Sequence, residues 1–151
     1  MVFDFFWHLR GSFALDMRTS NEAALDSLER LLDRQRKLTR DRGRADLVFD
    51  DPLWSNPFGP NWLAMVIYDR GRFWIEQGFD GRVLRYDLRS LHGMIFCLLG
   101  AFMFFAFGIA AGGLLGGIQF AALAFGWLYG MNILLALVRV PRAIRKAVRA
   151  R

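Results

Sequence analysis

The chain has 151 residues, enough for one modest domain and a membrane-embedded part but too few for two soluble domains with separate large cores. All 14 acidic residues lie at or before Asp87, so the net charge of +6 comes entirely from basic residues in the last 13 positions, 139–151. A basic tail directly after an apolar segment is typical of membrane topology, and we expect no nucleic-acid partner. The single cysteine, Cys97, excludes an intrachain disulfide and a cysteine-rich metal site.

The first predicted elements are a strand and a helix. Apolar and polar residues alternate over residues 5–17, which indicates a half-buried strand. Thr19 and Glu22 fit a capping box, and leucines then recur at helical spacing, so we predict a helix of about 20 residues. Basic residues gather near its end, where the helix dipole alone favours cations. We expect three of them to contact an acidic partner or anionic lipid: Arg36, Lys37 and Arg40.

The remainder of the N-terminal part is predicted to be a meander of strands. The ranges with strand composition are 45–49, 62–68, 72–76 and 82–88, with turns at 69–71 and 78–81. The order predicts an α+β domain over residues 1–90, with one helix on an antiparallel sheet. The loop 50–61 contains three prolines and two large aromatics, Trp54 and Phe58. We expect these aromatics to bind an unidentified protein partner, with packing on the domain itself as the alternative.

Residues Gly93 to Val138 contain no charged side chain. One spanning helix needs only about 20 residues, so we predict a two-helix transmembrane hairpin over 91–138, with spans near 93–112 and 117–138. Basic residues flank both ends, and the positive-inside rule then predicts a multi-pass protein with both termini in the cytoplasm. A shallow hairpin that enters and leaves one leaflet is an alternative with the same location of the termini.

Small and polar residues inside the apolar stretch are candidates for helix packing. Pairs of glycines recur at a spacing of four: Gly108 and Gly112, then Gly126 and Gly130. This spacing lets backbones approach closely, either within the hairpin or between copies in a homo-oligomer. Gln119 and Asn132 are costly in hydrocarbon unless they are hydrogen-bonded, so we expect them to bond neighbouring helices or to line a pathway. Trp127 and Tyr129 lie near the middle of the second predicted span and are expected to pack against the first.

The last predicted element is a short amphipathic helix over 139–151, separate from the domain. Pro141 suits the first turn of such a helix. Its basic residues are expected to contact anionic lipid headgroups: Arg139, Arg142, Arg145, Lys146 and Arg149. A tail that only enforces topology is the alternative.

The sequence contains no phosphate-binding loop, dinucleotide fingerprint, zinc-ligand spacing or nucleophile elbow. We therefore expect no cofactor, no metal site and no catalytic residue. Our hypothesis is a non-enzymatic, membrane-tethered cytoplasmic domain that recruits or regulates a partner at the inner membrane surface. The alternative is a small homo-oligomeric pore or transporter subunit in which Gln119 and Asn132 face inward.

Overall fold

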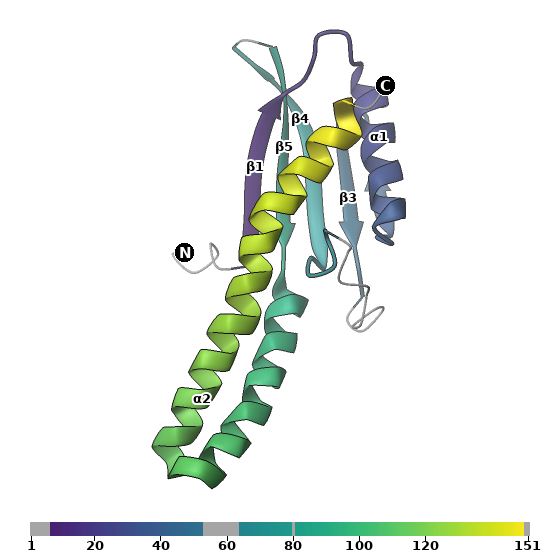
Figure 1. The fold of residues 1–151 in the computed structure, drawn as a ribbon. Helices are drawn as coiled ribbons and strands as arrows, with labels where there is room; N and C mark the ends of the chain where they lie inside the picture. Colours follow the sequence, from purple (N-terminus) through teal and green to yellow (C-terminus); the bar gives the residue numbers. More distant parts are fainter. Residues whose placement is uncertain (1–6, 53–63, 80, 150–151) are drawn as a thin grey trace.

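A single antiparallel sheet organises the chain. The computed structural model describes residues 7–52, 64–79 and 81–149 (Figure 1). Five strands lie in the order β1-β5-β4-β3-β2. Their bounds are His8–Ala14 (β1), Thr39–Arg42 (β2), Asp46–Asp50 (β3), Arg70–Gly78 (β4) and Gly81–Arg89 (β5). The helices of the described ranges are Asn21–Arg34 (α1) and Leu91–Arg149 (α2).

One face of the sheet carries the hydrophobic core. Side chains alternate along β4 and β5, so Phe73, Leu84 and Leu88 point to the same face and are fully buried. The leucine stripe of α1 packs on this face, and so do Val140 and Ile144 from the C-terminal part of α2. Figure 1 shows α1 and the yellow end of α2 side by side over the strands. Two helical segments, rather than the single predicted helix, therefore cover the sheet.

Local sequence explains where α1 begins and ends. The Ser20 hydroxyl accepts a hydrogen bond from the backbone N–H of Ala23 at 3.2 Å, which caps the first turn. The helix ends after 14 residues, and Arg36 then adopts a left-handed conformation with φ of 57°. The predicted helix of about 20 residues is thus too long. Its basic end belongs instead to the connection to β2.

Four strands coincide with predicted ones, and the hairpin between β4 and β5 turns at Gly78 and Gly81, as expected. The predicted strand over 62–68 is wrong in its described part, because residues 64–67 form turns. The predicted turn at 69–71 is also wrong, since β4 already begins at Arg70. The sheet is completed instead by β2, a polar edge strand that the sequence pattern missed.

The predicted two-helix transmembrane hairpin is contradicted by the structure. Residues Leu91–Arg149 form one helical element, and α2 is the one helix of the described ranges that is long and apolar enough to cross a membrane. Inside it, Gly112 and Gly113 depart from helical geometry, with φ values of −149° and 66°, and the chain turns back there (Figure 1). We call residues 91–111 the first arm, 114–138 the second arm and 139–149 the C-terminal part.

The helix also continues where a boundary was predicted at residue 138. Pro141 lies inside α2 and removes one backbone hydrogen-bond donor. The helix persists because Val140, Ile144, Ala147 and Val148 bury one stripe of the C-terminal part against the sheet. The apolar stripe predicted for an interfacial tail is therefore part of the core of the domain.

Candidate functional site at the junction of the sheet and α2

Several chain segments meet at one edge of the sheet. β3 ends at Asp50, which pairs with Arg70 at the start of β4, and Arg70 in turn pairs with Arg89 at the end of β5. α2 begins two residues later, at Leu91. We call this side the α2 edge. Because β5 continues into α2 here, the sheet fixes the position and direction of the first arm at this edge.

Asp69 is the central side chain of this edge. Its carboxylate is completely buried and accepts hydrogen bonds from Arg89, at 2.9 Å from Nε and 2.5 Å from Nη2. It also accepts the backbone N–H of His92 at 3.3 Å, in the first turn of α2. A carboxylate at a helix N-terminus satisfies free N–H groups and complements the helix dipole. Asp69 thereby fixes the start of the first arm to strand β5.

A second buried ion pair extends this network to the end of α1. The Lys37 side chain is only 6% exposed, and its ammonium donates to Asp51 at 2.6 Å and to the Tyr68 carbonyl at 2.7 Å. The Asp51 N–H donates to the Asp69 carbonyl at 2.7 Å. Burial raises the pKa of the Tyr68 hydroxyl, which stays neutral. Lys37, predicted to contact a partner, is thus engaged inside the domain.

Ser90 connects the edge to the second arm. Its hydroxyl donates to the Trp7 carbonyl at 3.2 Å and lies 3.2 Å from the Tyr129 hydroxyl. The second arm therefore passes the α2 edge at Tyr129. Tyr129 is buried, as expected, whereas Trp127 is 69% exposed.

Arginines surround the outer rim of the same edge. The Asp50 carboxylate accepts hydrogen bonds from Arg40 at 2.6 Å and from Arg70 at 2.7 Å. The hydrogen bond from Arg70 is the largest effect on the pKa of Asp50. Together with the hydrogen bond from Arg40, it lowers the pKa of this carboxyl below its ordinary value, although burial acts in the opposite direction. Arg36 is exposed at the left-handed turn after α1. Of the three basic residues predicted as a contact surface, Arg36 and Arg40 remain accessible.

The glycines chosen from the sequence have different environments. Gly108 is buried, and a Cβ atom there would lie 2.7 Å from the Gly116 carbonyl oxygen, so the glycine allows the arms to touch. Gly112 lies at the break. A Cβ atom at Gly126 or Gly130 would meet no atom within 4 Å. In the first pair, Gly108 therefore allows the arms to touch and Gly112 allows the chain to reverse, whereas both glycines of the second pair face open space.

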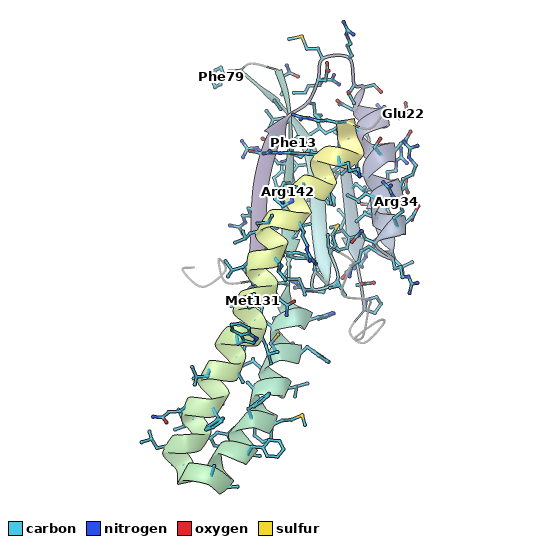
Figure 2. The ribbon with its side chains drawn as sticks, in the orientation of Figure 1. Phe13, Glu22, Arg34, Phe79, Met131 and Arg142 are labelled. Carbon is cyan, nitrogen blue, oxygen red and sulfur yellow. The ribbon has the colours of Figure 1, made fainter. Side chains whose placement is uncertain are left out.

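The other predicted positions lie on exposed surfaces or outside the described ranges. Gln119 is exposed, and the Asn132 amide donates to the Leu128 carbonyl at 2.8 Å, within its own helix. The predicted headgroup contacts are all exposed on the C-terminal part of α2: Arg139, Arg142, Arg145, Lys146 and Arg149. Figure 2 shows Met131 on the second arm, before α2 reaches the sheet, and Arg142 farther along α2, over the strands. Trp54 and Phe58 lie outside the described residues.

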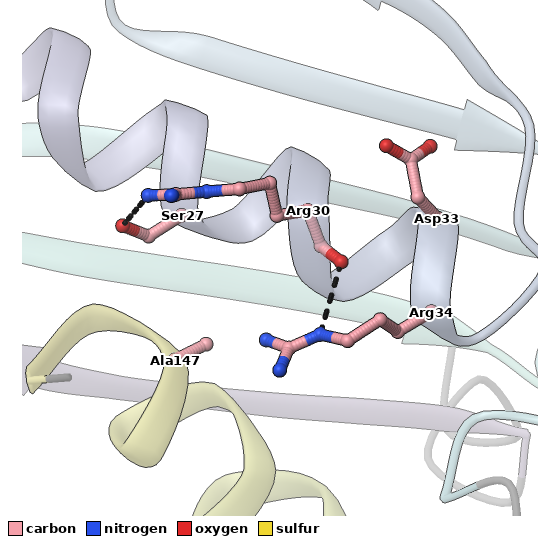
Figure 3. Close-up of a pocket in the computed structure, with 5 residues that line it drawn as sticks. All are labelled: Ser27, Arg30, Asp33, Arg34 and Ala147. Carbon is pink, nitrogen blue, oxygen red and sulfur yellow. Dashed lines mark hydrogen bonds between the residues drawn. The ribbon is translucent and has the colours of Figure 1, made fainter.

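A groove of about 480 Å³ separates α1 from the end of α2 (Figure 3). Its lining comes from both helices: Ser27, Arg30, Asp33, Arg34 and Ala147. Arg30 donates to the Ser27 hydroxyl at 3.2 Å, and Arg34 donates from Nε to the Arg30 carbonyl at 3.2 Å. Because these contacts lie within α1 and Asp33 opposes the cations, we assign no ligand to the groove.

Asp69 and Ser90 were missed in the sequence, although they hold the junction together. Asp69 lies in Tyr-Asp-Arg-Gly, a pattern that also fits a turn, and its partner Arg89 is 20 residues away. Ser90 directly precedes the apolar stretch, a position typical of helix starts and the one available signal.

The described residues hold no group of three or more His, Cys, Asp or Glu side chains placed to bind a metal ion. Comparison of the chain with protein-family models, curated proteins and solved structures gave no match.

Proposed function

We propose that the arms of α2 are embedded in a bilayer and that the sheet domain is a non-enzymatic module that recruits or regulates a protein at the membrane surface. The observation that carries this proposal is the exposure of the arms. The most apolar window of α2 has a mean hydropathy of 2.4, yet only 17% of that window is buried within the protein. The core helix of a soluble protein would be mostly buried.

Large apolar side chains project from the arms on several sides. Phe102 is 67% exposed, Phe107 70% and Leu123 74%. Each such side chain would gain about 1.5–3 kcal/mol on complete transfer out of water, so an aqueous environment is strongly unfavourable for the whole set. Lipid removes this penalty without requiring a partner protein.

The proposed orientation follows from the charges. The residues from Gly93 to Val138 are uncharged, whereas the sheet and the C-terminal part of α2 carry the basic groups. Basic segments are retained in the cytoplasm, so the sheet domain would lie on that side of the bilayer. β1 and the C-terminal part of α2 belong to the same sheet domain and therefore share that side.

The ion pairs and the core contacts of the junction support a rigid attachment of the sheet to α2. Asp69 joins the first arm to β5, Ser90 lies beside Tyr129 of the second arm, and Ile144 anchors the C-terminal part in the core. A domain held in this way would present its sheet in a fixed orientation to a partner. The face opposite α1 and α2 carries exposed charged side chains such as Arg10, Arg72 and Arg85.

Cysteine accessibility tests insertion and orientation together. In a Cys97→Ser background, Arg85→Cys and Leu114→Cys place single thiols on the sheet and beside the break, where Leu114 is 67% exposed. We expect a membrane-impermeant maleimide to label Arg85→Cys only from the cytoplasmic side, and the protein to resist alkaline extraction. Labelling of both positions from the cytoplasmic side, or release by alkali, would exclude the proposal.

Site-specific photocrosslinking in native membranes tests recruitment. A photoreactive residue in place of Arg72, whose side chain is 60% exposed, should capture a discrete protein, whereas one in place of Leu123 should capture lipid. A ladder of self-adducts from position 123 would favour the oligomer instead. The pore alternative receives no specific support, because the Asn132 amide is satisfied within its own helix.

A further inference from the structure

Three accessible arginines lie at the α2 edge, and a single carboxylate, that of Asp50, pairs with two of them. Lys37 is paired with Asp51 and Arg89 with Asp69, so these ion pairs are internal to the domain. The accessible cations that remain at this edge form a group that we call the arginine rim: Arg36, Arg40 and Arg70. Asp50 is the carboxylate that pairs with two of them, so the rim keeps a positive charge in excess.

The rim is solvent-accessible and includes an apolar side chain. The side chains of Arg40 and Arg70 are 67% and 50% exposed. Leu38 lies between Arg36 and Arg40 in the chain, is 66% exposed and accepts the Asp50 N–H through its carbonyl. Guanidinium groups beside an exposed leucine are the combination that the interface of an anionic bilayer favours.

The position of the rim along the arms agrees with the depth of lipid headgroups. The contact between Ser90 and Tyr129 sets the height at which the second arm passes the α2 edge. Trp127, two residues deeper in the arm, is 69% exposed, and exposed tryptophans concentrate at the boundary between hydrocarbon and headgroups. The rim therefore lies at headgroup height when the arms are in the bilayer.

The C-terminal part of α2 leads away from this height. Arg149 lies ten residues beyond Arg139, which corresponds to about 15 Å along a helix. The sequence alone favoured these tail residues for headgroup contact, but the rim is closer to the arms than the end of the tail.

We propose that Arg36, Arg40 and Arg70 form a binding surface for the phosphate groups of anionic phospholipids. This inference rests on the proposed insertion of the arms. The rim would fix the tilt of the sheet on the membrane and make the orientation of the domain depend on the anionic lipid content.

The test uses the full chain reconstituted in vesicles of phosphatidylcholine with 30% phosphatidylglycerol, and spin-labelled lipids of both kinds. Electron paramagnetic resonance then measures how strongly each lipid is immobilised by the protein. We expect a preference for phosphatidylglycerol that Arg70→Gln weakens severalfold, up to about fivefold per charge removed, and that added salt reduces.

Arg85→Gln is the matched control. Arg85 is 52% exposed and pairs with Glu76 at 2.7 Å, as Arg70 is 50% exposed and pairs with Asp50 at 2.7 Å. Arg85 lies opposite Trp74, four residues along β4 from Arg70, and therefore about 13 Å farther from the edge. The double variant Arg36→Gln/Arg40→Gln should repeat the loss, whereas Arg85→Gln should retain the wild-type preference.

The outcomes separate this inference from the proposed function. Immobilisation of phosphatidylcholine without a preference for phosphatidylglycerol would overturn the proposed phosphate binding by the arginine rim, while the proposed insertion would stand. An equal loss of the preference in Arg85→Gln would have the same meaning. The absence of any immobilised lipid would overturn insertion itself.

Discussion

The C-terminal part of α2 and its two arms belong to one helical element but bury their apolar residues in different ways. In the C-terminal part, Val140 and Ile144 are fully buried, while the basic residues around them are exposed. In the arms, apolar side chains such as Phe102 and Leu123 are exposed, and buried positions are sparse. The first pattern is that of a helix between a core and water, and the second is the pattern expected under the proposed insertion into lipid. The burial pattern therefore changes along a single helix.

The largest expected effect comes from the junction between these regions. Asp69→Ala leaves the Arg89 guanidinium without its partner and removes the acceptor for the His92 N–H. We expect a loss of about 3–5 kcal/mol in the free energy of unfolding, measured by urea titration in detergent micelles with circular dichroism. Asp46→Ala, which removes an exposed pair with Arg72, should cost less than about 1 kcal/mol. Equal losses would show that Asp69 does not hold the junction.

Truncation of one apolar side chain in each region tests the comparison directly. Ile144→Ala creates a cavity in the core of the sheet domain and should cost about 2–5 kcal/mol. Leu123→Ala removes a side chain that is 74% exposed and should change the unfolding free energy by less than about 0.5 kcal/mol. The same titration measures both, and similar values would contradict the division of α2 into a core part and exposed arms.

Two glycine substitutions examine contact between the arms. Gly108→Ala places a methyl group 2.7 Å from the Gly116 carbonyl oxygen and should destabilise the protein by about 1–3 kcal/mol. Gly126→Ala meets open space and should stabilise the helix by up to about 1 kcal/mol through its higher helix propensity. Thermal unfolding in the same detergent should give shifts of opposite sign. A lower melting temperature for Gly126→Ala would reveal a contact at that face.

The smallest expected effect is a pH dependence at the arginine rim. The pKa of Asp50 is lower in the folded protein than in the unfolded chain, so its contribution is complete above the unfolded pKa, near 4, and is lost as the pH falls through the folded pKa. Both partner arginines are at least half exposed, which limits the contribution to less than about 1 kcal/mol. Asp50→Asn should therefore be slightly less stable than the wild type at pH 7.

That difference should disappear in acid. Unfolding titrations between pH 7 and pH 2 should show the two proteins converging as the pH falls through the lowered pKa of Asp50 in the folded protein. A constant difference across this range would mean that the Asp50 charge does not contribute through its two ion pairs.

Much of the sheet could be predicted because its residues alternate or mark turns. The inward positions of β5 and the glycines of the β4–β5 hairpin are local signals. The cap of α1 was predicted one residue too early, at Thr19, whereas the Ser20 hydroxyl accepts the N–H of Ala23. β2 could not be found in this way. Its residues, Thr39–Arg42, are almost all exposed at an edge, so no apolar period marks the strand.

The architecture of α2 was mistaken for a physical reason. An amphipathic helix was predicted over 139–151, but periodicity shows only that one face of a helix is covered, not whether lipid or a sheet covers it. The junction was missed because Asp69 and Arg89 meet through the pairing of β4 with β5. Such contacts depend on tertiary structure and leave no signature at fixed spacing.

The burial of Val140, Ile144 and Val148 in the domain core also has a consequence for biosynthesis. Strands β1 to β5 leave the ribosome before the arms, yet their apolar face is covered completely only when residues 140–148 return to it. Under the proposed insertion, the nascent sheet would stay partly uncovered until the apolar arms reach the membrane. Folding of the domain would then report completed delivery, and chains stalled before residue 140 would expose a surface that chaperones and proteases recognise.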